Sequence, residues 1–174
     1  MELNQAIDLI KHQKVFNATK TSWADLGCGS GLFTNALGHM LVPGSTIFAV
    51  DNNIDALRRI QQLNNISIAK IKADFISDAL SLNALDGILM ANSLHFVKDK
   101  IEFIRKVEGY FKKPGCFLIV EYNTDKPTSW VPYPISFRSL QQLFESIQYS
   151  SIRKIHEVPS QLNQAKIYSS LITK

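Results

Sequence analysis

The stretch DLGCGSGLF, residues 25–33, decides the fold of this chain. It lies between an apolar run that reads as a strand, TSWADL at 21–26, and a helical pattern, SGLFTNALGHML at 30–41. Glycines occupy every second position within it: Gly27, Gly29 and Gly31. Glycine permits positive φ angles and close approach of a ligand, and the free N–H groups at a helix start favour an anion. The stretch predicts a strand-to-helix turn that either receives a nucleotide-like ligand or closes tightly with nothing bound.

Strand-like and helix-like patterns alternate along the rest of the chain. The strand-like runs are residues 21–26, 45–51, 66–74, 88–92, 116–122, 150–158 and 165–173. Asn53 and Ser136 are expected to cap helices, and KKPG at 112–115 is expected to end a helix that begins near Lys98. Right-handed crossovers place such helices on both faces of a parallel sheet. The last two runs have no helix between them and should pair antiparallel at one edge.

The predicted fold is therefore α/β and doubly wound, with a seven-stranded, mostly parallel sheet and an antiparallel edge pair. We expect one domain over residues 1–174, with an N-terminal helical segment at 1–20 and a loop at 123–135. This loop carries prolines and aromatic residues, and long loops inside compact domains are often functional.

Composition and charge narrow the class of protein. The net charge is +4, but the basic pairs are scattered, which argues against a nucleic-acid partner. No apolar run reaches the length of a membrane span, and the first residues do not resemble a secretory leader. The two cysteines, Cys28 and Cys116, fit no metal-binding spacing, so we expect no metal and a reducing, cytoplasmic setting.

An acidic residue follows the second expected strand. Asp51 lies about twenty residues after the last glycine, where a carboxylate can accept hydrogen bonds from both ribose hydroxyls. A helix cap is the alternative, but Asn52 and Asn53 can fill that role. The glycine spacing is G-x-G-x-G with an acid two residues ahead, whereas a dinucleotide fingerprint reads G-x-G-x-x-G. The spacing thus disfavours a dinucleotide.

At this point the chain resembles the class I S-adenosylmethionine-dependent methyltransferases, and their small-molecule branch in particular. The family's motif acid-x-G-x-G-x-G is matched in full by residues 25–31, and Asp51 matches the acid after the second strand. Looser motifs follow in order, at Asp74-Phe75 and at Asp86 with Leu94-His95-Phe96. The resemblance implies the cofactor S-adenosyl-L-methionine and a Rossmann-like methyltransferase fold.

The resemblance also assigns cofactor residues by position. They are Asp25, Gly27, Gly29, Gly31, Asp51, Asn52, Asp74, Phe75 and Asn92. Asp25 and the Asn92 carbonyl would lie near the cofactor's ammonium group, and Asp51 would bind the ribose. Asp74 would accept from the adenine amino group, although a plain turn at this position remains the alternative.

The cofactor's sulfonium makes its methyl group electrophilic, so the protein needs to hold an N, O, S or C acceptor in line with it. His95 is the candidate general base, with Glu121 and Tyr122 as alternatives; His95 could equally pack or cap the next helix. His95, Tyr122, Trp130 and Tyr133 are predicted to contact a small-molecule acceptor.

Three functions stay open on the sequence. The first is methyl transfer to a small molecule. The second is a non-catalytic module that binds S-adenosylmethionine or S-adenosylhomocysteine, and the third is an NAD-dependent oxidoreductase. Residues 91–94, ANSL, stand where base-modifying amino-methyltransferases carry a Pro-Pro motif, which argues further against nucleic acid. A homodimer is one way to complete the acceptor pocket, because the chain has few insertions.

Overall fold

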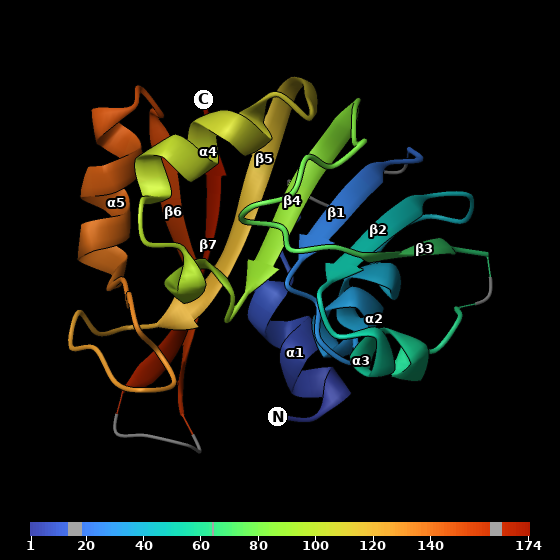
Figure 1. Cartoon of the computed structure of the whole chain (residues 1–174), viewed down its shortest axis with the longest axis horizontal. Coiled ribbons are helices and arrows are strands. Elements are labelled where there is room, and N and C mark those ends of the chain that lie inside the picture. The colour runs from blue at the N-terminus through green and yellow to red at the C-terminus, as the bar shows by residue number, and fades with distance from the viewer. Residues whose placement is uncertain (14–18, 64, 161–164) are drawn as a thin grey trace.

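The computed structural model describes residues 1–13, 19–63, 65–160 and 165–174. Its centre is a seven-stranded sheet in the order β3-β2-β1-β4-β5-β7-β6, with helices on both sides (Figure 1). The strands from β3 to β5 pair in parallel, whereas β7 is antiparallel to both β5 and β6. The expected doubly wound fold with an antiparallel edge pair is confirmed.

The elements have the following bounds. The strands are β1 Ser22–Leu26, β2 Thr46–Asp51, β3 Ser67–Lys72, β4 Leu85–Ala91, β5 Phe111–Tyr122, β6 Ser151–Pro159 and β7 Lys166–Thr173. The helices are α1 Leu3–Ile10, α2 Leu32–Gly38, α3 Ile54–Arg59, the 3₁₀ turn η1 Leu94–Phe96, α4 Lys100–Glu108 and α5 Phe137–Ser146. Of the expected N-terminal segment at 1–20, residues 14–18 lie outside the described residues. No helix in the described part is both long and apolar enough to span a bilayer.

Side chains that alternate between the two faces of each strand explain why helices cover both faces of the sheet. Trp23 and Ala24 are adjacent in β1 and almost fully buried, yet they join different hydrophobic clusters. The cluster around Ala24 includes residues of α4 and α5, and the cluster around Trp23 includes residues of α1, α2 and α3. Side chains of successive strand residues point to opposite faces, so each helix layer buries one of them.

Two expected helix caps are confirmed. The Asn53 side chain accepts hydrogen bonds from the backbone N–H groups of Asp55 and Ala56, at 3.0 and 3.1 Å, and begins α3. The Ser136 hydroxyl accepts from the Ser139 N–H at 3.2 Å and begins α5. Each cap satisfies N–H groups that have no partner within the helix.

The structure corrects several expected boundaries. Residues 112–115 do not end a helix: α4 ends at Glu108, and the KKPG sequence lies inside β5. Asp86 and Gly87 belong to β4, where the Asp86 carboxylate accepts from the Ser22 N–H at 2.8 Å and pairs with Lys112 at 2.6 Å. This places Asp86 at the amino ends of the strands, opposite the glycine turn. Residues 73–84 join β3 to β4 through turns rather than a helix.

A serine side chain of β7 anchors helix α1 to the sheet. The buried hydroxyl of Ser169 donates to the Leu9 carbonyl near the end of α1 and accepts from the His156 N–H of β6. The next residue, Ser170, is equally buried, but its hydroxyl has no partner within the described structure. Two neighbouring, equally buried serines on opposite faces of β7 thus differ in the hydrogen bonds that they make.

Replacing Ser169 by alanine should lower the free energy of unfolding by about 1–3 kcal/mol, because the buried Leu9 carbonyl and the part-buried His156 N–H lose their partner. Ser170→Ala is the matched control and should leave stability unchanged or raise it. Urea unfolding of both variants measures the difference. Equal losses would show that the hydroxyl of Ser169 does not anchor α1.

Candidate functional site

The glycine stretch forms the turn that the sequence predicts. After β1, Gly27, Gly29 and Gly31 take positive φ angles of 78°, 53° and 87°. The N–H groups of Gly27 and Cys28 both donate to the Val50 carbonyl of β2, at 2.9 and 3.1 Å. The turn is therefore fixed to the neighbouring strand at the carboxyl end of the sheet, where ligands of doubly wound proteins bind.

The three glycines are needed for different reasons. A Cβ atom on Gly27 would lie 2.6 Å from the Cβ of Ser93, and one on Gly31 would lie 2.7 Å from Ile60. A Cβ on Gly29 would meet nothing within 4 Å. Gly27 and Gly31 thus allow close packing inside the protein, whereas Gly29 is the glycine that faces open space.

Asp51 holds the open part of the turn. One carboxylate oxygen accepts from the Gly29 N–H at 2.8 Å, and the other accepts from the Asn53 N–H at 2.9 Å. Each carboxylate oxygen can accept a further hydrogen bond. Its neighbour Asn52 is exposed. The structure thus brings Asp51 against the glycine turn, as the sequence predicts.

Two buried oxygens at the carboxyl ends of β1 and β4 lack a donor. Asp25 accepts from the Thr34 hydroxyl through Oδ2 at 2.6 Å, but its Oδ1 has no partner in the described structure, and neither has Oδ1 of Asn92. Burial raises the pKa of Asp25 to about 7, against a smaller lowering by the Thr34 hydrogen bond. Buried acceptors without donors are rare, which makes both oxygens candidates for contacting a ligand.

Asp74 and Phe75 follow β3. Asp74 Oδ1 accepts from the Ile76 N–H at 2.9 Å, so Asp74 does form the turn that was its alternative role. The Phe75 ring is buried and packs edge-on against Phe103, with ring centroids 5.8 Å apart. A Cβ on Gly27 would also lie 3.0 Å from this ring, so Phe75 packs against the glycine turn.

A cavity of about 560 Å³ adjoins the predicted cofactor residues at Asn92. Its walls include α1, the first turn of α2, the ends of β4 and β5, and parts of β6 and β7. Residues in contact with it include Leu9, Phe33, Asn92, Tyr122, Val158 and Ile167. Asn92 belongs to the predicted cofactor residues and Tyr122 to the predicted acceptor residues, so the cavity links the two sets. Helix α1 forms one wall of the cavity and lies over the sheet there.

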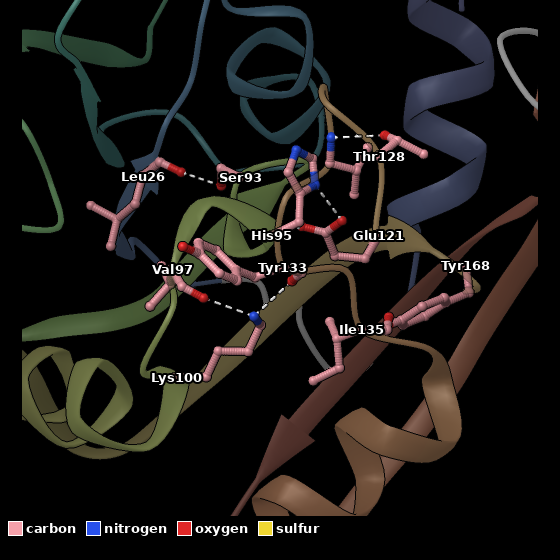
Figure 2. Close-up of polar contacts among 11 residues, drawn as sticks. Leu26, Ser93, His95, Val97, Lys100, Glu121, Thr128, Tyr133, Ile135 and Tyr168 are labelled. Atoms are coloured by element: carbon pink, nitrogen blue, oxygen red, sulfur yellow. Dashed lines mark hydrogen bonds and ion pairs between the residues drawn. The ribbon is translucent and has the colours of Figure 1, made fainter. Parts of the chain in front are cut away.

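His95 lies in η1, beside the cavity residue Tyr122, with ring centroids 6.2 Å apart. The ring is almost fully buried, and its Nδ1 lies 2.8 Å from Oε2 of the buried Glu121 (Figure 2). The sequence singled out both residues as candidate bases but could not show that they contact each other. Their pairing makes them one unit, which lies beside the cavity residue Tyr122 but does not line the described cavity.

The loop at 123–135 is held away from the cavity walls. Trp130 is 85% exposed and Tyr133 40% exposed, and neither is among the described residues that line the cavity. The Tyr133 N–H donates to the His95 carbonyl at 3.0 Å, and the Tyr133 carbonyl accepts from Lys100 Nζ at 2.7 Å. Burial lowers the pKa of Lys100. The structure does not bring Trp130 and Tyr133 to the cavity, so their contact with an acceptor stays a prediction.

Several residues of the site carried no signal in the sequence. Thr34, Ser93 and Ile60 reach the glycine turn from other elements, and no local pattern marks such contacts. Both cysteines are free, and burial raises the pKa of Cys116 to about 12 and that of Cys28 further, so neither is poised as a nucleophile. The described residues contain no cluster of three or more His, Cys, Asp or Glu that could hold a metal.

Comparison with known proteins adds a family and a set of similar structures. A family model described as a methyltransferase domain matches residues 17–172. A search of curated proteins found no match.

Solved structures with the same fold include the plantazolicin methyltransferase BpumL in complex with SAH: 16% identity, 99% of this chain and 83% of that chain covered, TM-score 0.69. An S-adenosylmethionine (SAM)-dependent methyltransferase from Aquifex aeolicus has 16% identity, 99% and 98% coverage and a TM-score of 0.65. The 1,6-didemethyltoxoflavin-N1-methyltransferase from Burkholderia thailandensis, with bound S-adenosylhomocysteine, has 16% identity, 99% and 77% coverage and a TM-score of 0.73. At these identities the likeness concerns the fold.

The glycine turn predicts a graded response to alanine substitution. Gly27→Ala should lower the free energy of unfolding by about 3 kcal/mol, since it combines a left-handed backbone with a clash against Ser93. Gly29→Ala should cost about 1–2 kcal/mol, because the backbone penalty acts alone. Denaturant unfolding measures both. A larger loss for Gly29→Ala than for Gly27→Ala would contradict the assignment of packing to Gly27.

Proposed function

The chain belongs to the methyltransferase domain family, and from this premise we propose that it transfers a methyl group from S-adenosylmethionine to a small-molecule acceptor. The family match also confirms the resemblance that the glycine motif suggested. S-adenosylmethionine supplies an electrophilic methyl group on its sulfonium sulfur. The protein's part is to bind this cofactor, to place the acceptor atom in line with the methyl carbon and to exclude water.

The observation that carries the proposal is the pair of unsatisfied oxygens. Asp25 Oδ1 and Asn92 Oδ1 are buried acceptors at the carboxyl ends of two adjacent strands, and neither has a donor in the described structure. The ammonium group of an amino-acid cofactor supplies donors and a positive charge that suit both oxygens. Gly29, in the turn that follows β1, leaves open space at this edge of the sheet. The residues present therefore fit the cofactor.

The remaining cofactor contacts follow from the same edge of the sheet. Asp51 would accept from the ribose hydroxyls with the lone pairs that its bonds to Gly29 and Asn53 leave free. Asn52, exposed beside it, would lie at the rim of this site. Asp74 would accept from the adenine amino group, and the Phe75 N–H would meet a ring nitrogen. Gly27, Gly29 and Gly31 would keep the turn in the conformation that admits the cofactor.

The cavity under α1 is the proposed acceptor site. It adjoins the cofactor residues at Asn92, and its walls are mostly apolar, which supports a small molecule with an apolar body. Lysine and arginine do not occur among the described residues that line it, whereas Asp8 and Glu157 do. Such walls disfavour an anionic acceptor, nucleic acid included. In this proposal residues 1–174 form one methyltransferase domain, with His95 as the base and Tyr122 at the acceptor.

Two features of the wider proposal rest on the sequence. The free cysteines support a reducing, cytoplasmic setting. A homodimer would bring a second chain to the open side of the acceptor cavity. A binding module without catalysis shares all the cofactor contacts, and acceptor turnover separates it from an enzyme.

Calorimetry with S-adenosylhomocysteine and with NAD tests the cofactor. We expect saturable binding of S-adenosylhomocysteine and none of NAD. Asp51→Ala should weaken binding by about 1.5–3 kcal/mol, because hydrogen bonds to a carboxylate are lost. Asn53→Ala is the control: it removes the cap of α3 and some stability but leaves affinity unchanged. NAD binding in place of S-adenosylhomocysteine would overturn the proposal, and full affinity in Asp51→Ala would remove the ribose role.

The pH dependence of binding tests the role of Asp25. Its pKa, raised by burial to about 7, means that the free protein carries a neutral carboxyl below that pH. An ammonium group prefers the ionised form, so affinity for S-adenosylhomocysteine should rise between about pH 6 and pH 8. The free protein should lose stability as the pH rises from about 4, where Asp ionises in the unfolded chain, to about 7, and should change little above that. Asp25→Asn should flatten both profiles; unchanged profiles would refute the assignment.

A larger side chain in the cavity should weaken binding of the acceptor without weakening binding of the cofactor. Val158→Phe on β6 narrows the cavity without touching the glycine turn. We expect the KM for the acceptor to rise at least about tenfold, a loss of about 1.4 kcal/mol of binding, with unchanged affinity for S-adenosylhomocysteine. Steady-state kinetics and calorimetry measure the two quantities. A parallel loss of both would argue that the cavity is not the acceptor site.

A further inference from the structure

The pairing of His95 with Glu121 joins two elements that are distant in sequence. Oε1 of Glu121 accepts from the His95 backbone N–H at 3.0 Å, and Oε2 lies 2.8 Å from Nδ1 of the same residue. The carboxyl group thus contacts His95 twice, at its backbone and at its ring, and Figure 2 shows the contact with the ring. Glu121 is fully buried and His95 is 3% exposed, so water does not compete for these bonds.

This double contact fixes the imidazole in one orientation and one tautomer. A carboxylate accepts hydrogen bonds, so the nitrogen that faces it carries the proton. The proton of a neutral ring then lies on Nδ1, and Nε2 keeps its lone pair. Figure 2 shows this second nitrogen turned away from Glu121. Nε2 has no hydrogen-bond partner in the described parts of the chain.

The backbone around the ring is fixed as well. The His95 carbonyl accepts from the Tyr133 N–H at 3.0 Å, while its N–H is held by Glu121. Lys100 Nζ donates to the carbonyls of Val97 and Tyr133, at 2.8 and 2.7 Å, and so joins η1 to the loop at 123–135 (Figure 2). The ring has little freedom to exchange its two nitrogens.

The place of the pair relates it to the proposed reaction. His95 lies three residues after Asn92, and Tyr122 directly follows Glu121. Asn92 and Tyr122 both line the acceptor cavity. The pair thus lies close along the chain to two residues of the cavity wall, although His95 and Glu121 are not themselves among the described residues that line the cavity. A buried carboxylate that served stability alone would be a costly choice here, since burying a charged group rarely gains free energy over apolar packing.

We propose that Glu121 is a positioning residue that keeps the proton of His95 on Nδ1, so that Nε2 accepts the proton that the methyl acceptor loses. The assignment rests on the proposed methyl transfer. It narrows the substrate class to acceptors whose nucleophilic atom carries a proton that must leave, such as a hydroxyl or thiol. In the transfer, the acceptor's X–H bond breaks, the proton goes to Nε2, and the electron pair left on X forms the bond to the methyl carbon as the carbon–sulfur pair returns to sulfur.

The geometry predicts an unusual effect of Glu121→Gln. The backbone N–H of His95 always donates, so the single oxygen of the glutamine amide must serve it. The amide NH₂ group then faces Nδ1 and donates to it, which moves the ring proton to Nε2. The variant keeps the size and the number of hydrogen bonds, yet it should reverse the tautomer.

Nitrogen-15 NMR of the histidine rings in the full chain tests this, with His95→Gln identifying the His95 signals. We expect the wild type to show the Nδ1–H tautomer and Glu121→Gln to show the Nε2–H tautomer. Glu108→Gln is the matched control. Its carboxylate also holds two donors, Tyr149 and Lys174, but they lie at the other end of β5, and the His95 signals should not change.

Three results of the tautomer measurement would overturn the proposal: an Nε2–H tautomer in the wild type, a doubly protonated ring at neutral pH, or an unchanged tautomer in Glu121→Gln. The wild-type spectrum decides even if the variant fails to fold. Adding S-adenosylmethionine should shift Nε2 of His95 and leave the exposed His39 unchanged, and no shift on cofactor binding would also contradict the role. Calorimetry on the same samples reports cofactor binding separately, so a failure of the proposed function is distinguishable from a failure of the Glu121 assignment.

Discussion

The contact between Asp51 and the Gly29 N–H, 2.8 Å long, joins the two strand ends on which the site depends. Together with the bonds from Gly27 and Cys28 to the Val50 carbonyl, it fixes the turn after β1 to the end of β2. A turn built from residues with positive φ has little intrinsic preference for one shape, so these bonds select it. Packing of Ser93 and Ile60 against Gly27 and Gly31 then excludes other shapes. The open space beside Gly29 is a consequence of this arrangement.

Local patterns predicted most of the fold, and non-local contacts account for the differences. The caps at Asn53 and Ser136 depend on neighbours within three residues, so the sequence displays them. The boundary errors have another origin. The expected strand at 88–92 leaves out Gly87, yet in β4 this residue gives room to the Trp23 ring, since a Cβ there would lie 2.3 Å from it. A contact between residues so far apart leaves no trace in the local pattern.

The site residues likewise divide into those that a local pattern predicts and those that only the folded chain brings together. The spacing of the glycines and Asp51 reflects one local unit, and the structure brings those residues together. Whether a glycine packs or leaves space, and whether Glu121 is buried against His95, depends on elements that meet only in the folded chain. The aromatic residues of the loop at 123–135 drew attention by composition, whereas much of the cavity wall comes from residues of α1 and β6 that no motif marked. Composition shows which residues are unusual but not which way they face.

A crystal structure of the protein with S-adenosylhomocysteine would test the central claim most directly. The account predicts the amino-acid end of the ligand at Asp25 and Asn92, its ribose hydroxyls on the Asp51 carboxylate, and its sulfur facing the cavity under α1. A ligand bound elsewhere would contradict it. So would a ligand seated at the glycine turn with its sulfur turned away from that cavity, because methyl transfer requires the two sites to meet.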